Sequence, residues 1–82
     1  MDQKSVVGKW VQETYGNFYM FFEDGKFYTN HFDGGPVEGR YTFVGDKLEL
    51  FSLAIDFRKL TYKINENYFE VIGRKVSRFY KQ

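Results

Sequence analysis

Turn-forming residues recur along this chain roughly every eight to twelve positions, and this spacing limits the folds that the chain can adopt. The turn signals are Tyr15-Gly16-Asn17, Asp24-Gly25, Asp33-Gly34-Gly35-Pro36, Gly45-Asp46, Asn65-Glu66-Asn67 and Gly73-Arg74. The segments between them are rich in β-branched and aromatic residues, which favour strands. We therefore expect strands at residues 8–14, 18–23, 26–32, 37–44, 47–51, 57–64, 68–72 and 76–80.

The expected connections are all short, so strands that are neighbours in sequence should pair antiparallel. If the first strand also pairs with the last, the sheet closes and neither edge stays exposed. The prediction is an all-β, antiparallel up-and-down barrel of about eight strands, formed by a single domain that spans residues 1–82. Brief helical candidates are limited to residues 5–7 and 52–56. Asp24-Gly25 predicts a two-residue hairpin loop with positive φ at both positions.

Aromatic residues make up 22% of the chain, and on the second expected strand they occupy both faces. Tyr19 and Phe21 share one face, and the residues between and beside them share the other. A barrel needs one apolar face per strand, so the second apolar face is surplus. The surplus face predicts a surface for a protein partner or for self-association, and it consists of Phe18, Met20, Phe22, Tyr28 and Phe32. The alternative is that residues 52–56 or a chain terminus cover these side chains.

The inward face of the expected barrel also carries large rings. The inward aromatic residues are Trp10, Tyr19, Phe21, Phe27, Tyr41, Phe43 and Tyr62. An eight-stranded barrel has an interior just wide enough for side chains, so these rings could fill it. Alternatively, they line a small cavity near the open mouth that holds a small apolar ligand, with tyrosine hydroxyls as its polar groups.

Charge is unevenly distributed along the chain, although the net charge is only +1. Residues 1–57 hold five cationic and nine acidic side chains, whereas residues 58–82 hold seven cationic and two acidic ones. The two segments would neutralise each other if they pair in the fold; otherwise the last strands present a basic patch. Such a patch could bind nucleic acid, which the small net charge disfavours. Its residues would be Arg74, Lys75, Arg78, Tyr80 and Lys81.

Residues that could support catalysis or metal binding are sparse. The chain has no cysteine and one histidine, His31, whose nearest potential co-ligand is Asp33. Two ligands are too few for a metal site, so His31 is interpreted as a surface residue at a strand end. The serines lie in no nucleophile motif, and Gly34-Gly35-Pro36 precedes a strand and not the helix that a phosphate-binding loop requires. The sequence predicts no enzyme, no cofactor and no metal.

Three segments, VVGKWV (residues 6–11), YMFFEDGKF (19–27) and EGRYTFVGDKLEL (38–50), resemble the compact lipocalin-like domains of bacteria. The shared pattern is a Gly-x-Trp opening, an aromatic strand that ends in Asp-Gly, a Gly-x-Tyr strand, and a Leu-x-Leu strand after a Gly-Asp turn. The resemblance covers most of residues 6–51. It implies a small up-and-down barrel with Trp10 closing one end, frequent export, a binding role and no reaction.

The leading hypothesis is a non-enzymatic binding module whose partner is another protein or a second copy of the chain. A small apolar ligand is the alternative, and nucleic acid is the second alternative. No apolar run reaches the length of a membrane-spanning helix, and residues 1–5 lack the apolar core of a signal peptide. The chain as written is thus expected in the cytoplasm, and a removed leader would instead imply a secreted or lipid-anchored protein.

Overall fold

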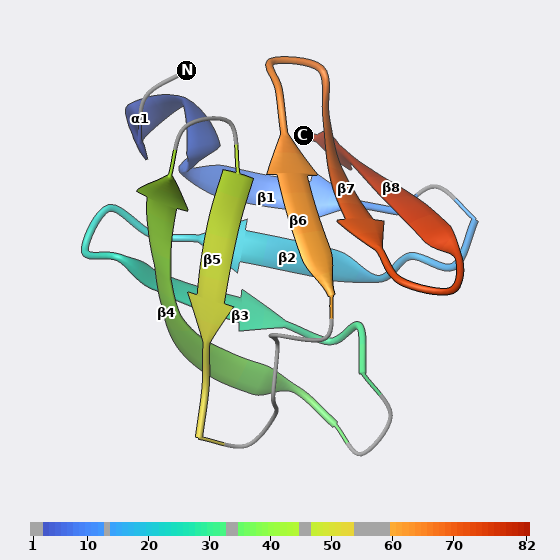
Figure 1. Ribbon diagram of the computed structural model, residues 1–82, viewed down its shortest axis with the longest axis horizontal. Coiled ribbons are helices and arrows are strands. Elements are labelled where there is room, and N and C mark those ends of the chain that lie inside the picture. Colours follow the sequence, from blue (N-terminus) through green and yellow to red (C-terminus); the bar gives the residue numbers. More distant parts are fainter. Residues whose placement is uncertain (1–2, 13, 33–34, 45–46, 54–59) are drawn as a thin grey trace.

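The computed structural model describes residues 3–12, 14–32, 35–44, 47–53 and 60–82. Within these residues a short helix, α1 (Gln3–Val6), precedes eight strands. The strands are β1 (Gly8–Val11), β2 (Phe18–Phe21), β3 (Lys26–Thr29), β4 (Val37–Val44), β5 (Lys47–Phe51), β6 (Thr61–Ile64), β7 (Tyr68–Ile72) and β8 (Val76–Lys81). Consecutive strands pair antiparallel and β8 pairs with β1, so the sheet closes into an up-and-down barrel (Figure 1). This arrangement confirms the predicted fold class.

Several strands are shorter than predicted, because turns begin inside the expected strands. After β1, the Gln12 backbone N–H donates to the Asn17 carbonyl at 2.8 Å, and the Gly16 N–H donates to the Gln12 carbonyl at 3.0 Å. These bonds turn the chain toward β2 before residue 14. β3 is also shorter than predicted, since it ends at Thr29 and not at residue 32. β6 begins at Thr61, and residues 57–59 of the predicted sixth strand lie outside the described residues.

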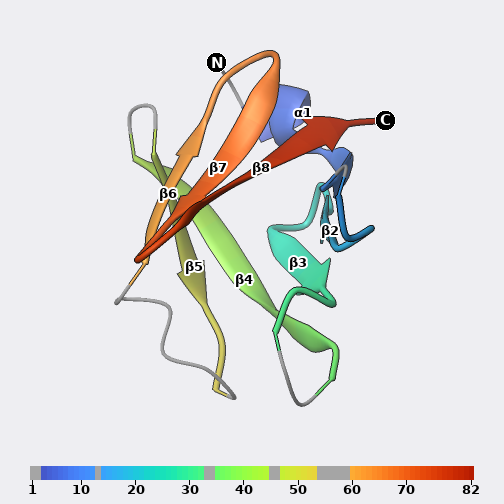
Figure 2. The same ribbon diagram turned by 90° about the vertical axis from the view of Figure 1, so that its right-hand side faces the viewer.

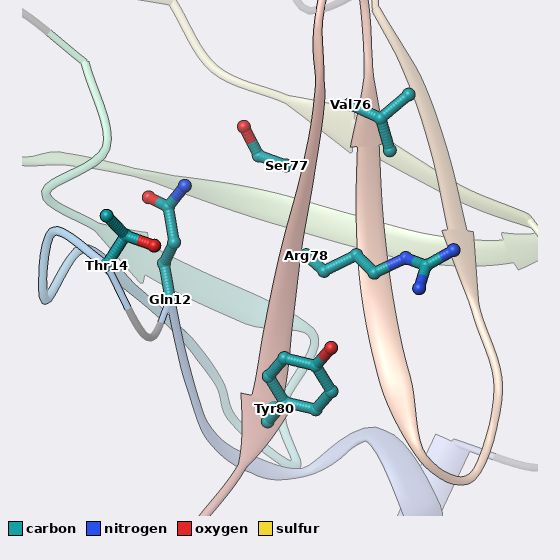
Figure 3. A pocket seen from close by; sticks show the side chains of 6 residues that line it. All are labelled: Gln12, Thr14, Val76, Ser77, Arg78 and Tyr80. Atoms are coloured by element: carbon teal, nitrogen blue, oxygen red, sulfur yellow. The ribbon is translucent and has the colours of Figure 1, made fainter.

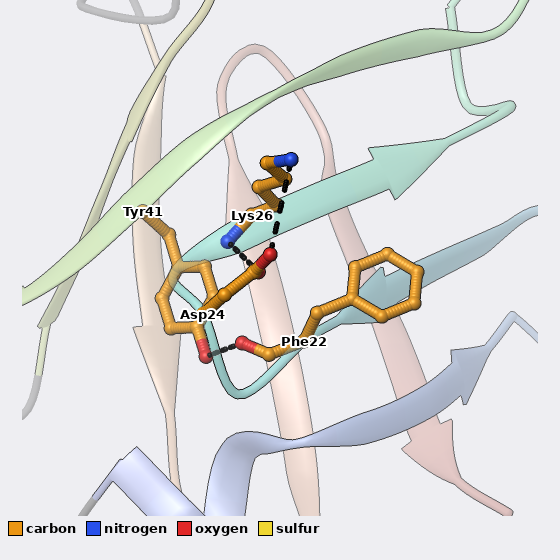
Figure 4. Close-up of polar contacts among 4 residues, drawn as sticks. All are labelled: Phe22, Asp24, Lys26 and Tyr41. Atoms are coloured by element: carbon orange, nitrogen blue, oxygen red, sulfur yellow. Dashed lines mark hydrogen bonds and ion pairs between the residues drawn. The ribbon is translucent and has the colours of Figure 1, made fainter.

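The β2–β3 hairpin loop differs from the predicted two-residue turn. The Phe22 N–H donates to the Lys26 carbonyl at 2.9 Å and the Gly25 N–H donates to the Phe22 carbonyl at 3.1 Å, which leaves three loop residues, 23–25. Gly25 has a φ of +87°, and no described residue other than glycine has a positive φ. The loop is therefore the three-residue type in which only glycine is left-handed. Asp24 serves differently: its Oδ1 accepts the Lys26 backbone N–H at 3.1 Å (Figure 4).

The barrel interior is formed by the inward-facing side chains of every strand, as the alternation predicts. The buried apolar residues are Val6, Trp10, Tyr19, Phe21, Phe27, Val37, Tyr41, Leu48, Leu50, Tyr62, Ile64, Phe69, Val71 and Phe79. Trp10 Nε1 donates to the Val6 carbonyl at 2.8 Å, and Lys81 Nζ donates to the Ser5 carbonyl at 2.9 Å. The first bond joins α1 to β1, and the second joins it to the end of β8 (Figures 1 and 2). Of the other helical candidate, residues 54–56 lie outside the described residues.

β4 is the long, curved strand that passes from one side of the barrel to the other (Figure 1). Its residues 37–40 pair with β3, and its residues 40–44 pair with β5. Gly39 lies where the pairing partner changes. A Cβ at this position would lie 2.8 Å from Phe27 Cε1 and would collide with the carbonyl oxygen of Phe51. Glycine therefore permits the close approach of three strands at this bend.

Candidate functional site

The predicted surplus face lies in large part on the outer wall of the barrel. Phe18, Met20 and Tyr28 are half-buried on the outside of β2 and β3, and Phe22 is 41% exposed at the end of β2. The Phe18 and Tyr28 rings stack with their centroids 5.9 Å apart. Lys9 Nζ lies 4.8 Å from the Phe18 ring centroid. The outward rings thus form an ordered surface with a cation above it.

Phe32 departs from this face and packs against the buried core. The strict alternation of inward and outward side chains holds only within a strand, and β3 ends at Thr29. Phe32 lies three positions after the end of β3, so its side chain need not point outward as that of Tyr28 does. Four of the five predicted surface residues therefore remain on the outer wall.

Closure of the barrel extends this surface across the β1–β8 pairing. Val11 is opposite Phe18 on one side and opposite Tyr80 on the other, and Tyr80 is in turn opposite Tyr68. The Tyr68 and Tyr80 ring centroids lie 6.4 Å apart. One apolar row therefore crosses β2, β1, β8 and β7. We name this surface the seam patch, and it consists of Lys9, Val11, Phe18, Met20, Tyr28, Tyr68, Arg78 and Tyr80.

The five residues predicted for nucleic-acid contact are divided among three places. Arg78 and Tyr80 belong to the seam patch, whereas Arg74 and Lys75 are exposed in the turn between β7 and β8. Lys81 lies at the end of the barrel, with its Nζ bonded to α1 and 5.8 Å from the Trp10 ring centroid. The structure does not bring these five side chains together as one basic patch.

Arg78 joins the cationic and aromatic parts of the seam patch. Its Nε donates to Glu70 Oε2 at 3.0 Å, and its guanidinium carbon lies 4.6 Å from the Tyr68 ring centroid. The hydrogen bond with Glu70 is the main reason that the pKa of Arg78 is raised. Arg78 and Glu70 both belong to the basic segment 58–82, so Glu70 neutralises part of the positive charge of that segment. The guanidinium thus lies over an aromatic ring while it is paired with a carboxylate.

A hollow of about 390 Å³ adjoins the seam patch where β1 and β8 separate (Figure 3). The described strands pair at Trp10 with Lys81 and at Val11 with Tyr80. Beyond these pairs the chain of β1 turns away toward β2. We name this space the seam hollow, and it is lined by Gln12, Thr14, Val76, Ser77, Arg78 and Tyr80. Two of its lining residues are also members of the seam patch.

The residues predicted to line a ligand cavity are mostly packed against one another. Trp10, Tyr19, Phe21 and Phe27 are at most 1% exposed, and Phe43 packs against the same core. The Tyr19 ring meets the Phe69 and Phe79 rings edge-on, with centroids 5.0 Å apart in each case. The Phe21 and Tyr41 centroids are also 5.0 Å apart. These are ordinary packing distances for aromatic rings in a core.

Tyr41 and Tyr62 additionally line a hollow of about 560 Å³ in the barrel wall. We name it the wall hollow. Its apolar lining consists of Tyr41, Leu48, Leu50, Phe51, Leu60 and Tyr62, and its polar lining consists of Arg40, Thr42 and Glu49. Its lining residues belong to β4, β5 and β6, together with Leu60.

A buried polar cluster includes His31, which the sequence analysis interpreted as a surface residue. His31 is half-buried, and its Nδ1 lies 3.0 Å from Tyr19 Oη. Thr29 is fully buried; its hydroxyl donates to the Phe18 carbonyl at 2.7 Å and accepts the His31 backbone N–H at 3.1 Å. Burial lowers the pKa of His31, and burial together with the neighbouring Tyr62 raises the pKa of Tyr19. His31 follows Phe27 and Thr29 at two-residue spacing, and alternation along the strand could therefore have predicted that it points inward as they do.

Comparisons with known proteins do not identify a functional site in this chain, so the site is assigned from the geometry described above. No family model, no curated protein and no solved structure matches the chain. In the described ranges, no three or more His, Cys, Asp or Glu side chains gather as a metal site would require, and Asp33 lies outside these ranges. Helices capable of crossing a bilayer are likewise missing from the described part of the chain. The candidate site is therefore the seam patch with its adjoining hollow.

Proposed function

We propose that this chain is a non-catalytic binding protein that contacts another protein chain through the seam patch. The observation that carries the proposal is the apolar row of Phe18, Val11, Tyr80 and Tyr68, which is continuous across four neighbouring strands. Aromatic residues, methionine and arginine are enriched in the cores of protein interfaces. The patch also contains Met20 and Arg78, so its composition fits that class of surface.

The rings of the seam patch are held in place before any partner arrives. Phe18 stacks on Tyr28 and lies under Lys9, and Tyr68 lies under Arg78. A surface that is already ordered loses little conformational entropy on binding. The cations and the neighbouring ring also cover ring faces on which nucleic-acid bases would have to stack. This arrangement favours a protein partner over single-stranded nucleic acid.

The seam hollow offers a place for one side chain of the partner. Four strands at a spacing of about 4.8 Å make the row roughly 14 Å wide, and the hollow adjoins the row at Tyr80. Residues that dominate binding energy commonly insert into such pockets beside an apolar patch. An aromatic or arginine side chain of the partner would fit this position.

The resemblance to compact bacterial lipocalin-like domains agrees with this proposal. We propose kinship with those domains on the basis of the Gly8-x-Trp10 opening and the buried position of Trp10 in a closed eight-stranded barrel. Such kinship implies binding without a reaction. It does not specify which wall of the barrel is used.

Photo-crosslinking from the two walls of the barrel tests the proposed function. We would place p-benzoylphenylalanine at position 80 in the seam patch, or at the exposed position 42 on β4, and irradiate each protein in a lysate of its source organism. We expect protein adducts from position 80 alone. Excess wild-type protein should abolish these adducts, and a competitor carrying Thr42→Glu should do the same, whereas a Tyr80→Glu competitor should not.

The same experiment separates the alternatives. An adduct of twice the chain mass would identify a second copy of this protein as the partner. Equal adducts from both positions, or none from position 80, would contradict the proposal. Salt-sensitive retention of a thymidine oligonucleotide that is lost in Tyr80→Glu would instead assign the patch to nucleic acid.

A further inference from the structure

The wall hollow lies on different strands from the seam patch and offers a second, chemically distinct site. Among the described residues, β5 and β6 pair only at Lys47 with Lys63 and at Leu48 with Tyr62. β5 nevertheless continues to Phe51 along β4, so its last residues extend past the pairing with β6 (Figure 1). The hollow of about 560 Å³ beside them is within the usual range for small-molecule sites.

The lining of the wall hollow is apolar with a cation at its rim. Leu50, Leu60 and Tyr62 supply apolar wall, and Phe51 adds a ring that is 65% exposed. Arg40 is opposite Phe51 in the β4–β5 register, and it lines the same hollow. An exposed ring beside an apolar hollow is a surface that an apolar ligand would cover.

A second cation lies next to Arg40 on the adjacent strand. Lys26 is directly opposite Arg40 in the β3–β4 register, and like charges in this position destabilise a sheet. Asp24 lies 3.8 Å from Lys26 Nζ (Figure 4) and offsets part of this charge. Glu49 lines the hollow on the far side, opposite Thr42. The rim is thus cationic toward β3 and acidic toward the start of β5.

We propose that the wall hollow binds an amphipathic anion, meaning an apolar chain or ring system that bears one carboxylate or phosphate. The apolar part contacts Leu50, Leu60 and Phe51, and the anionic group lies at Arg40 on the side of Lys26. Charge complementarity to these two cations selects the anion. This inference is independent of the seam patch, which shares no residue with the hollow.

Calorimetric titration with two amphiphiles of equal chain length tests this inference. Decanoate and decyltrimethylammonium have the same tail and opposite head charges, and each is used below its micelle concentration. We expect saturable binding of decanoate and at least tenfold weaker binding of the cation. Decyl phosphate should bind as decanoate does if any anionic head suffices, and tighter binding of one of them would identify the preferred head.

Matched variants locate the binding. Arg40→Gln should weaken decanoate binding by about tenfold, since it removes a charged partner, and should strengthen the binding of the cation, because it removes a repelling charge. Phe51→Ser should weaken the binding of both amphiphiles. Phe22→Ser is the control, because Phe22 is also an exposed ring but does not line the wall hollow, and it should weaken the binding of neither. Glu49→Gln should strengthen decanoate binding, because it removes a repelling carboxylate.

Three results would overturn the inference. They are the absence of saturable decanoate binding, equal binding of both amphiphiles, and decanoate binding that survives both Arg40→Gln and Phe51→Ser. Tyr80→Ser serves as the control for the opposite wall. A loss of decanoate binding in that variant would assign the site to the seam hollow and so reject the wall hollow. The proposed protein-binding function is tested separately, by the photo-crosslinking experiment.

Discussion

At the scale of single residues, His31 is the side chain whose chemistry is most changed by the fold. Its ring lies among Tyr19, Phe32 and Phe79, with centroids 5.1–5.6 Å away. Its Nδ1 shares a hydrogen bond with Tyr19 Oη at 3.0 Å. A protonated imidazole would lose the acceptor at Nδ1 and would place a charge among these rings. The folded protein therefore favours neutral His31.

This preference makes the stability depend on pH. The pKa of His31 is lowered from its ordinary value of 6.5, so the unfolded chain binds this proton more readily than the folded chain. The stabilising contribution is complete above pH 6.5 and is lost as pH falls through the folded-state pKa. We expect the free energy of unfolding, measured in urea, to decrease between pH 7.5 and pH 5.

His31→Phe isolates this effect, because His31 is the only histidine in the chain. The variant should lose the decrease that the wild type shows in this pH interval. At pH 7.5 it should be less stable by about 1 kcal/mol, since Tyr19 loses a hydrogen-bond partner. A wild type and a variant with parallel pH profiles would show that His31 does not control this dependence.

At the scale of elements, β4 determines the shape of the barrel. It pairs with β3 in its first half and with β5 in its second half, and it changes partners at Gly39 and Arg40. The β2–β3 hairpin is tied to the same strand, since Tyr41 Oη donates to the Phe22 carbonyl at 2.7 Å (Figure 4). The bend in β4 therefore positions both the hairpin loop and the cationic rim of the wall hollow.

Gly39→Ala tests the role of this bend. The added methyl group would press on the Phe27 ring and on the Phe51 carbonyl, and the carbonyl belongs to paired backbone that cannot move freely. We expect a loss of about 3 kcal/mol in the free energy of unfolding, at the upper end of overpacking effects. Gly16→Ala is the matched control: Gly16 has a φ of +70° and open space around it, so strain alone should cost about 1 kcal/mol. Equal losses in both variants would refute the close-approach explanation.

At the scale of the whole molecule, the pairing of β1 with β8 does two things. It closes the sheet, so that neither strand has an exposed edge there. It also places Val11 beside Tyr80, which joins an aromatic segment near the N-terminus to a cationic, aromatic segment near the C-terminus. The seam patch exists only because of this contact between the two ends of the chain.

Deletion of residues 80–82 tests the contribution of closure. It removes the pairing of Tyr80 and Lys81 with β1, the 2.9 Å bond from the Gln82 N–H to the Lys9 carbonyl, and the bond from Lys81 to α1. We expect a loss of about 3 kcal/mol or more in urea unfolding, because several hydrogen bonds and the cover of a strand edge are lost together. Light scattering should also detect association through the exposed edge of β1.

Tyr80→Ser is the control for this deletion. It removes an exposed ring and keeps the backbone pairing, so its loss of stability should stay near that of an ordinary surface substitution, about 0.5 kcal/mol. If the deletion variant were as stable and as monomeric as the full chain, closure by β8 would not hold the barrel together.

The sequence by itself determined the local features of this protein. Turn residues at regular spacing located all eight strands, and two-residue alternation assigned Trp10, Tyr19, Phe21 and Tyr41 to the interior, because both signals depend on neighbours a few positions apart. The tertiary structure alone decided where strands end, and hence that Phe32 packs against the core. It also decided which outward side chains share a surface, since Phe18 and Tyr80 meet through β1, and no local pattern encodes a contact between segments that are about sixty residues apart.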